Sequence, residues 1–312
     1  MTLLPTRALP GPGHPHRPGS GWRTSSVSAV AALVLVTGCG DGPTPAPDPG
    51  TTAPPTTEPA PTAAPTATPA PTATSEAPTP SEVAVYYLVD TRAGFRLARE
   101  LREVTGDPLV GAVEAMIEGP TDPDYATTWN SDTEVLSVEQ GPGTITVDLS
   151  EDARTANAGS EAAALMVQQL VHTVVEAAGE DASVQLLIDG EPAGELWGVL
   201  TWDEPVAPEN PVDVRVLVQI DRPVEGAEVT SPVTVSGEAN AFEANVPWRV
   251  LRPDGTEVTD GFTMTTAGQE FAPFSFEVEL EPGTYVVEIS EDDPSGGEGG
   301  TPMTDTRTFT VE

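Results

Sequence analysis

The feature that most constrains folding is a tract from Pro43 to Pro80 made almost wholly of proline, threonine, alanine, serine and glycine. Such a composition cannot bury enough apolar surface to offset the entropy lost on ordering. We therefore expect an extended stalk rich in polyproline II, on the order of 100 Å long at about 3.1 Å per residue. Folded cores must come from the residues that follow, which leave room for about two domains.

The segment before this tract has the order of a signal peptide. Arg7, Arg17 and Arg23 precede an uncharged, largely apolar run from Val27 to Val36. This run is shorter than the ~20 residues that a permanent transmembrane helix needs. We therefore interpret residues 1–38 as a cleaved leader.

The leader ends in Val36-Thr37-Gly38-Cys39, which resembles a lipobox, the signal of bacterial lipoproteins. The resemblance implies cleavage before Cys39 and a diacylglycerol on its thiol, with acyl chains such as palmitate inserted in the membrane. An ordinary secretory leader with a chance cysteine is the alternative. On the lipoprotein interpretation, residues 39–81 hold the protein on the outer face of the cytoplasmic membrane, extending into the cell wall.

The charge balance excludes one class of partner. Aspartate and glutamate number 49 against 13 basic residues, all of them arginine, for a formal net charge of −36. Binding to nucleic acids depends on lysine and arginine neutralising phosphates, so we exclude nucleic acid as a partner. Cys39 is the only cysteine, so no internal disulfide can form.

Residues 82–205 show alternating strand and helix patterns. Apolar runs or alternations predict strands over 83–88, 95–104, 135–138, 145–149 and 184–188. Two apolar stripes of helical period separate them, one capped by Asp107 and stopped at Gly119, the other capped by Ser160 and ended by Gly179. The order predicts an α+β domain in which a mixed sheet carries two helices on one face.

Several short motifs in this region recur in the order seen in one family. They are Val85-Tyr86-Tyr87-Leu88, Glu118-Gly119-Pro120, Thr146-Val147-Asp148-Leu149-Ser150, Gln169-Leu170-Val171-His172-Thr173 and Ile188-Asp189-Gly190. The region resembles a GerMN domain, the sporulation and germination module of envelope lipoproteins. The family's proline-containing stretch after the first helix is poorly matched around residues 128–135.

Residues 206–312 predict an all-β sandwich. Short strands over 214–220, 233–239, 246–251, 274–280, 285–289 and 308–311 are separated by turn signals such as Asp254-Gly255, with no convincing helix. We expect Trp248, Phe274, Phe276, Tyr285 and Phe309 to fill the core.

This second region resembles the immunoglobulin-like domain of bacterial spore germination, the Gmad type. The motifs that carry the resemblance are Ile220-Asp221-Arg222-Pro223, Val229-Thr230-Ser231-Pro232-Val233, Val235-Ser236-Gly237-Glu238-Ala239, Phe242-Glu243, Asp254-Gly255 and Ile289-Ser290-Glu291-Asp292-Asp293. The chain inserts residues 294–300 where the family usually has a plain glycine turn.

No pattern of catalytic residues is visible, so we predict that the protein is not an enzyme and has no catalytic residue or cofactor. Lysine is absent, which removes Schiff-base and Ser/Lys chemistry, and zinc would need a Cys/His cluster. His172 is interpreted as a solvated residue on the polar face of its helix, beside Gln168, Gln169 and Glu176.

Two groups of residues are weaker site candidates. Glu291, Asp292, Asp293 and Glu298 could hold calcium, although their spacing matches no EF-hand and a solvated acidic loop is the alternative. Trp197 and Trp202 form a candidate partner surface, or else pack a last strand or the boundary between the domains.

These observations predict a lipid-anchored envelope protein that works as a non-catalytic binding or assembly module. The two resemblances imply a link to sporulation or germination, and the expected partners are envelope proteins, cell-wall components or further copies of the chain. One alternative is an accessory protein that binds or cleaves cell-wall glycan through a carboxylate pair. Another is a calcium-stabilised adhesin module.

Overall fold

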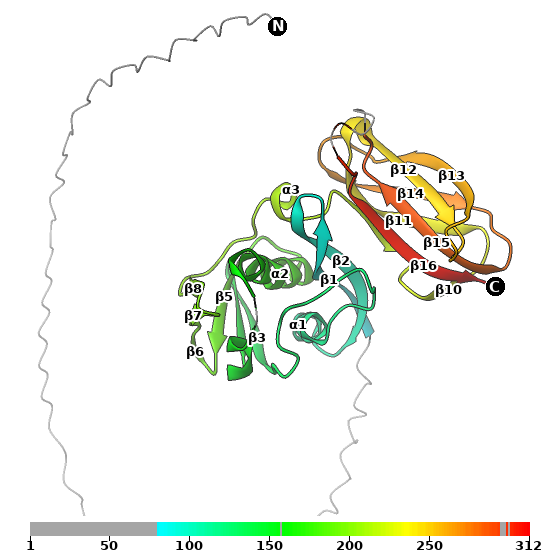
Figure 1. The fold of residues 1–312 in the computed structure, drawn as a ribbon. Helices are drawn as coiled ribbons and strands as arrows, with labels where there is room; N and C mark the ends of the chain where they lie inside the picture. Colours follow the sequence, from blue (N-terminus) through cyan, green and yellow to red (C-terminus); the bar gives the residue numbers. More distant parts are fainter. Residues whose placement is uncertain (1–79, 157, 294–297, 299) are drawn as a thin grey trace, which may run out of the picture. The chain divides into compact units, whose positions relative to one another are not determined.

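The computed structural model describes residues 80–156, 158–293, 298 and 300–312, which belong to one compact unit. Cys39 and the proline-rich tract up to residue 79 lie outside the described residues. Two domains follow one another along the chain, the first ending after Trp202 and the second beginning its sheets at Val218 (Figure 1). Among the described residues, no helix has both the length and the apolar character needed to cross a membrane.

The first domain contains two principal helices and several strands. Its elements are β1 (Pro80–Thr91), β2 (Gly94–Thr105), α1 (Pro108–Glu118), β3 (Val135–Gly141), β4 (Thr144–Leu149), a 3-10 turn (Glu151–Arg154), α2 (Ser160–Ala178), β5 (Ser183–Ile188), β6 (Glu191–Pro192), β7 (Gly194–Leu196) and β8 (Leu200–Trp202). This content confirms the predicted α+β class.

The strands of this domain divide into separate sheets. β3, β4, β5 and β6 form one mixed sheet in which β4 and β5 run parallel. The long antiparallel hairpin β1–β2 is a sheet of its own, and α1 and α2 pack between it and the mixed sheet (Figure 1). The expectation of one sheet with helices on one face is wrong in this respect, because loop residues occupy the hairpin edges. Leu88 pairs with Ala126, and the N–H of Val216 donates to the carbonyl of Leu97 at 2.9 Å.

Local signals fix the helix ends. The Asp107 side chain accepts hydrogen bonds from the backbone N–H groups of Leu109 (2.9 Å) and Val110 (3.4 Å), with Pro108 at the first helical position. Helix α2 ends at Gly179, which adopts the left-handed conformation with φ 66°. Its N-cap is Gly159 and not Ser160, which is the first helical residue.

The second domain is a sandwich of two sheets. Its elements are α3 (Pro211–Val214), β9 (Val218–Arg222), β10 (Ala227–Val229), β11 (Val233–Asn240), a 3-10 turn (Phe242–Ala244), β12 (Asn245–Leu251), β13 (Glu257–Met264), β14 (Phe271–Val278), β15 (Gly283–Ser290) and β16 (Thr304–Val311). One sheet has the order β10-β16-β15-β12-β13 and the other β14-β11-β9. The all-β prediction is confirmed.

Two details of this domain differ from the sequence prediction. The stretch from Pro211 to Val214 forms a helical turn capped by Asn210, so the first strand starts at Val218 and not at residue 214. β13 was not predicted, because as an edge strand it contributes little to the core and Asp260 and Gly261 interrupt its apolar residues.

The predicted aromatic core is present, with a gradient of burial. Phe274, Tyr285 and Phe309 are buried, whereas Trp248 and Phe276 are half-buried and pack against the core. These last two rings stack with centroids 4.5 Å apart and an interplanar angle of 9°.

Candidate functional site

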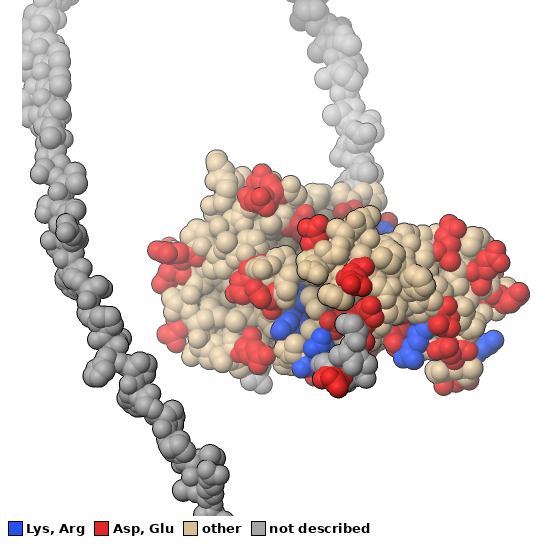
Figure 2. Space-filling view, turned by 90° about the horizontal axis from the view of Figure 1, so that it is seen from above, with Lys and Arg blue, Asp and Glu red and all other residues tan. Residues whose placement is uncertain are grey.

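The arginines of this acidic chain concentrate where the two domains meet. Among the described residues, every arginine except Arg96 and Arg252 lies within salt-bridge distance of a carboxylate. Five of these pairs join the first domain to the second: Arg92–Glu291, Arg99–Asp221, Arg99–Glu238, Arg222–Glu82 and Arg307–Asp122. We call this region the junction. In Figure 2 the visible surface elsewhere shows carboxylates far more often than arginines.

A buried cluster around Arg307 forms the centre of the junction. Arg307, on β16, donates from Nη1 to Asp122 (2.6 Å) and Asp305 (2.9 Å), and from Nη2 to the hydroxyl of Tyr125 (2.9 Å) and the carbonyl of Ile220 (3.0 Å). The Tyr125 hydroxyl donates to Asp305 at 2.7 Å. Side chains of the first domain thus meet partners from β9 and β16.

Burial controls the electrostatics of this cluster. It raises the pKa of Asp122 to about 6, although Arg307 acts in the opposite direction, and it also raises the pKa of Asp305. The pKa of the Tyr125 hydroxyl is raised well above its usual value, first by burial and then by Asp305. Burial alone would lower the pKa of Arg307, but Asp305, Tyr125 and Asp122 raise it, so the guanidinium stays charged.

A second ionic group lies beside the first. Arg99, on β2, makes a two-pronged contact with Asp221 at 3.0 and 2.9 Å and donates to Glu176 of α2 at 2.8 Å. Arg215 pairs with Glu238 on β11, and its guanidinium lies 4.3 Å from the ring centroid of Phe271. The junction therefore fixes β2, α2, β9 and β11 to one another.

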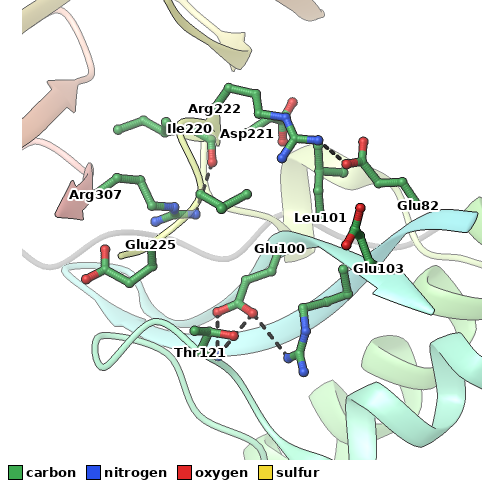
Figure 3. A pocket seen from close by; sticks show the side chains of 12 residues that line it. Glu82, Glu100, Leu101, Glu103, Thr121, Ile220, Asp221, Arg222, Glu225 and Arg307 are labelled. Atoms are coloured by element: carbon green, nitrogen blue, oxygen red, sulfur yellow. Dashed lines mark hydrogen bonds and ion pairs between the residues drawn. The ribbon is translucent and has the colours of Figure 1, made fainter. Parts of the chain in front are cut away.

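A cavity of about 400 Å³ opens at the junction (Figure 3). Its lining includes the carboxylates of Glu82, Glu100, Glu103 and Glu225. Glu100 is buried and accepts from the backbone N–H groups of Thr121 (2.9 Å) and Asp122 (2.7 Å).

Most of these carboxylates have structural partners. Glu225 accepts from the backbone N–H of Thr308 at 2.7 Å, and Glu82 pairs with Arg222. A general acid or nucleophile needs a group that is free to exchange protons or to attack a substrate. The geometry therefore suits a fixed connection between domains better than a catalytic pair.

The environment of His172 differs from the sequence prediction. The side chain is 7% exposed, its ring lies 5.5 Å from that of Tyr86, and burial followed by the nearby Arg215 lowers its pKa to about 4. The prediction of a solvated face is wrong for His172, Gln168 and Gln169, which β1 and the connection between the domains cover, whereas Glu176 near the end of the helix is exposed. Gln169 donates to the carbonyl of Tyr86 at 2.9 Å, and Gln168 accepts from the N–H of Glu209 at 2.8 Å.

The two tryptophans pack inside the first domain. Trp202 is 1% exposed and its Nε1 donates to the carbonyl of Val184 at 3.3 Å, so it is unavailable as a partner surface. Trp197 is half-buried against Trp129, with ring centroids 5.5 Å apart, and donates to the carbonyl of Ala153 at 3.0 Å. Both rings stabilise the end of the domain.

The acidic loop is partly engaged with other groups. Glu291 accepts from Arg92 at 2.8 Å and from the N–H of Met303 at 2.6 Å, and Asp292 accepts from Asn245 at 3.0 Å. Asp293 lines a small cavity that Arg92 also lines, and Glu298 is exposed between residues that the structure does not describe. The described residues contain no group of three or more carboxylates, histidines or cysteines placed to hold a metal. Calcium binding stays a prediction.

Sequence reasoning missed the residues at the centre of the junction. One signal could have found two of them. The inward-facing residues of β16 alternate as Asp305, Arg307, Phe309 and Val311, so the two charged side chains share a face with core residues. Asp122 and Tyr125 lie in a loop whose local sequence carries no comparable pattern.

The two domains define the class of protein. Residues 84–194 match a family described as sporulation and spore germination, and residues 217–298 match the immunoglobulin-like domain of bacterial spore germination. The chain is therefore a two-domain protein of the sporulation and germination type, a GerMN domain followed by an immunoglobulin-like Gmad domain. Both resemblances inferred from the sequence are confirmed. These families are sporulation- and germination-related accessory domains, not known enzymes.

Solved structures similar to this chain are distant from it. The tandem GerMN domains of the sporulation protein GerM from Bacillus subtilis are 16% identical with a TM-score of 0.34, covering 42% of this chain and 45% of that one. The chain thus spans less than half of that relative's length. A putative lipoprotein from Clostridium perfringens is 18% identical with a TM-score of 0.30, covering 44% of this chain and 93% of that one. No curated protein sequence matches.

Proposed function

We propose that the chain is a membrane-anchored, extracytoplasmic module that binds or assembles other components of the cell envelope in a process related to sporulation or germination, without catalysis of its own. The observation that carries this proposal is the junction. Its buried Arg307 cluster joins two accessory domains into one unit and uses the nearby carboxylates as structural acceptors. A fixed pair of domains suits the presentation of surfaces to partners.

The sequence supports the anchoring. A diacylglycerol on Cys39 would insert two acyl chains, and each buried methylene contributes about 0.8 kcal/mol, so the second chain converts marginal membrane binding into stable anchoring. The proline-rich stalk would then hold the folded domains in the cell wall. Envelope proteins, wall components and further copies of the chain are the partners within reach there.

The anchor is tested by cell fractionation with a Cys39→Ala variant. The full chain should stay in the membrane fraction after a high-salt wash, because acyl chains and not charges retain it. The variant should appear in the soluble extracytoplasmic fraction or the medium. Equal retention of both forms would mean that the thiol does not anchor the protein.

The binding role is tested by crosslinking the anchored protein in intact cells. Recovery of envelope or wall-synthesis proteins, or of a ladder of the chain itself, supports an assembly role. Recovery of glycan fragments alone, together with release of muropeptides by the purified chain, would instead identify a wall-cleaving accessory protein. The Cys39→Ala variant is the matched control, since its crosslinks report contacts that do not need the membrane.

A further inference from the structure

The edge strand β13 exposes a row of large apolar side chains. Phe262 is 69% exposed, Met264 52% and Val258 38%. Together with Asp260, these residues occupy alternate positions of the strand and are exposed. The residues between them are half-buried, and Glu257 at the start of the strand is also exposed. A solvent-facing row of this kind is uncommon on a chain with a formal net charge of −36.

The backbone of β13 is open on one side. In the part of the chain that the structure describes, β13 forms a backbone ladder only with β12. Contacts with β14 occur at its C-terminal end, where the Thr263 hydroxyl donates to the carbonyl of Ser275 at 3.2 Å and the N–H of Thr266 to that of Pro273 at 3.1 Å, so the unpaired edge is the stretch before Thr263. Natural proteins usually protect such an edge with lysine, proline or a very short strand. β13 has eight residues, Glu257–Met264, and contains neither lysine nor proline.

Carboxylates lie beside this apolar row. Asp260 is opposite Arg249 on β12, but Arg249 already donates to Glu288 at 2.8 Å. Asp260, Glu257 and Glu288 together line a shallow cavity of about 390 Å³. A lysine or arginine side chain placed next to Asp260 would therefore meet an excess of negative charge.

We propose that β13 is a docking strand, to which a partner protein adds an extended segment that alternates apolar side chains with at least one lysine or arginine. Its backbone would pair with the open edge, its apolar side chains would lie beside Val258, Phe262 and Met264, and its cation beside Asp260. This inference rests on the proposed binding role and specifies the chemistry of the partner.

Geometry and charge argue against a second copy as the occupant. Antiparallel pairing of two β13 strands over their full length would set Asp260 of each copy opposite Gly261 of the other, and because directly opposite residues share a face, the apolar rows of the two copies would point to opposite faces of the sheet and could not pack together. The remaining surfaces of the two copies would also repel each other, since each carries a formal charge of −36.

A synthetic peptide tests the proposal. The probe is a peptide as long as the eight residues of β13, alternating valine with arginine, titrated calorimetrically into the full chain at physiological salt. We expect binding that weakens by about tenfold or more in Phe262→Glu and in Met264→Glu, each of which removes an apolar contact and adds like charge. Leu136→Glu is the matched control, because Leu136 is 47% exposed on β3 of the other domain.

Two altered probes separate strand addition from simple charge attraction. The same residues in scrambled order, and the same peptide with alternate amides N-methylated, should both bind at least tenfold more weakly. Equal binding of these probes, binding that ignores Phe262→Glu, or no binding overturns the proposal. Self-association of the unmodified chain that Phe262→Glu abolishes would overturn it in favour of a second copy. If the docking strand fails these tests while Cys39-dependent membrane retention and the envelope crosslinks persist, only the docking-strand proposal is disproved and the proposed binding role stands.

Discussion

At the scale of single residues, Arg307 supplies the one positive charge between two buried carboxylates, Asp122 and Asp305. Replacing it by methionine would keep much of the side-chain volume but leave those carboxylates buried without a cation. Removing one partner of a buried ion pair typically costs about 3–5 kcal/mol. We expect Arg307→Met to lower the free energy of unfolding by that amount, measured by urea denaturation.

Arg249→Met is the control for this substitution. Arg249 pairs with Glu288 at 2.8 Å, but its side chain is 49% exposed, and exposed pairs contribute about 1 kcal/mol or less. The variant should therefore unfold close to the unmodified chain. Losses of similar size in the two variants would show that the Arg307 cluster does not stabilise the junction as its burial implies.

His172 gives the protein a pH dependence that a neutral replacement should remove. Its pKa falls to about 4 in the folded state, below the usual 6.5, so it contributes stability above pH 6.5 that is lost as the pH falls toward 4. At pH 5 the loss is about 2 kcal/mol. His172→Leu has no such group to protonate. On lowering the pH from 7.5 to 5, we therefore expect its free energy of unfolding to rise by about this amount relative to that of the unmodified chain.

His172→Leu must be compared with the unmodified chain because Asp122 changes the free energy of unfolding in the opposite direction over the same pH range. Burial raises its pKa to about 6 from 3.8, so its contribution to stability is present below pH 3.8 and is lost as the pH rises through 6. The unmodified chain alone reports the sum of both groups. A difference between His172→Leu and the unmodified chain that stays constant with pH would contradict the burial of a neutral His172.

At the scale of elements, Gly237 shows how close the strands of the second sandwich sheet approach. It lies on β11 at a register shift against β9, where an added Cβ atom would be 2.0 Å from the carbonyl oxygen of Gln219 and 2.8 Å from Phe274. Gly237→Ala must therefore displace backbone, and we expect a loss of about 2 kcal/mol or more. Thermal unfolding of this variant measures the loss of stability.

Gly159→Ala serves as the comparison for that substitution. Gly159 precedes α2, and a Cβ atom there would have no neighbour within 4 Å. Its expected change is within about 1 kcal/mol, the range for loss of a favoured N-cap residue. Similar effects of the two alanines would show that β9 can move away from β11 at little cost.

The elements that the sequence predicts best are those with local signals. Asp107, Pro108 and Gly179 mark helix ends through their own backbone preferences, and alternations such as Ile145, Val147 and Leu149 mark strands. Which strands pair is decided by residues distant along the chain. The isolation of β1–β2 and the covering of the polar face of α2 depend on segments near Ala126 and Val216, whose local sequence gives no sign of this.

At the scale of the whole molecule, the junction combines buried charge with partners from both domains. Arg99 links β2 of the first domain to β9 and β11 of the second, and Arg307 links β16 of the second domain to Asp122 of the first. This acidic chain has few cations, and several of them lie in the junction. Separation of the domains would therefore leave carboxylates such as Asp122 and Asp221 without their cations. The junction should therefore oppose domain separation, since a hydrogen bond to a charged group contributes a net stabilisation of about 1.5–3 kcal/mol.

This coupling predicts how the chain unfolds. Scanning calorimetry of the full chain should show one transition, because neither domain can leave the junction without exposing its share of the ionic clusters. In the double variant Arg99→Met and Arg307→Met, which removes both central cations, we expect two resolved transitions, one for each domain. The pair Arg154→Met and Arg249→Met, whose arginines pair within single domains, should keep one. Two transitions in the unmodified chain would show that the domains fold independently and that the junction does not couple them.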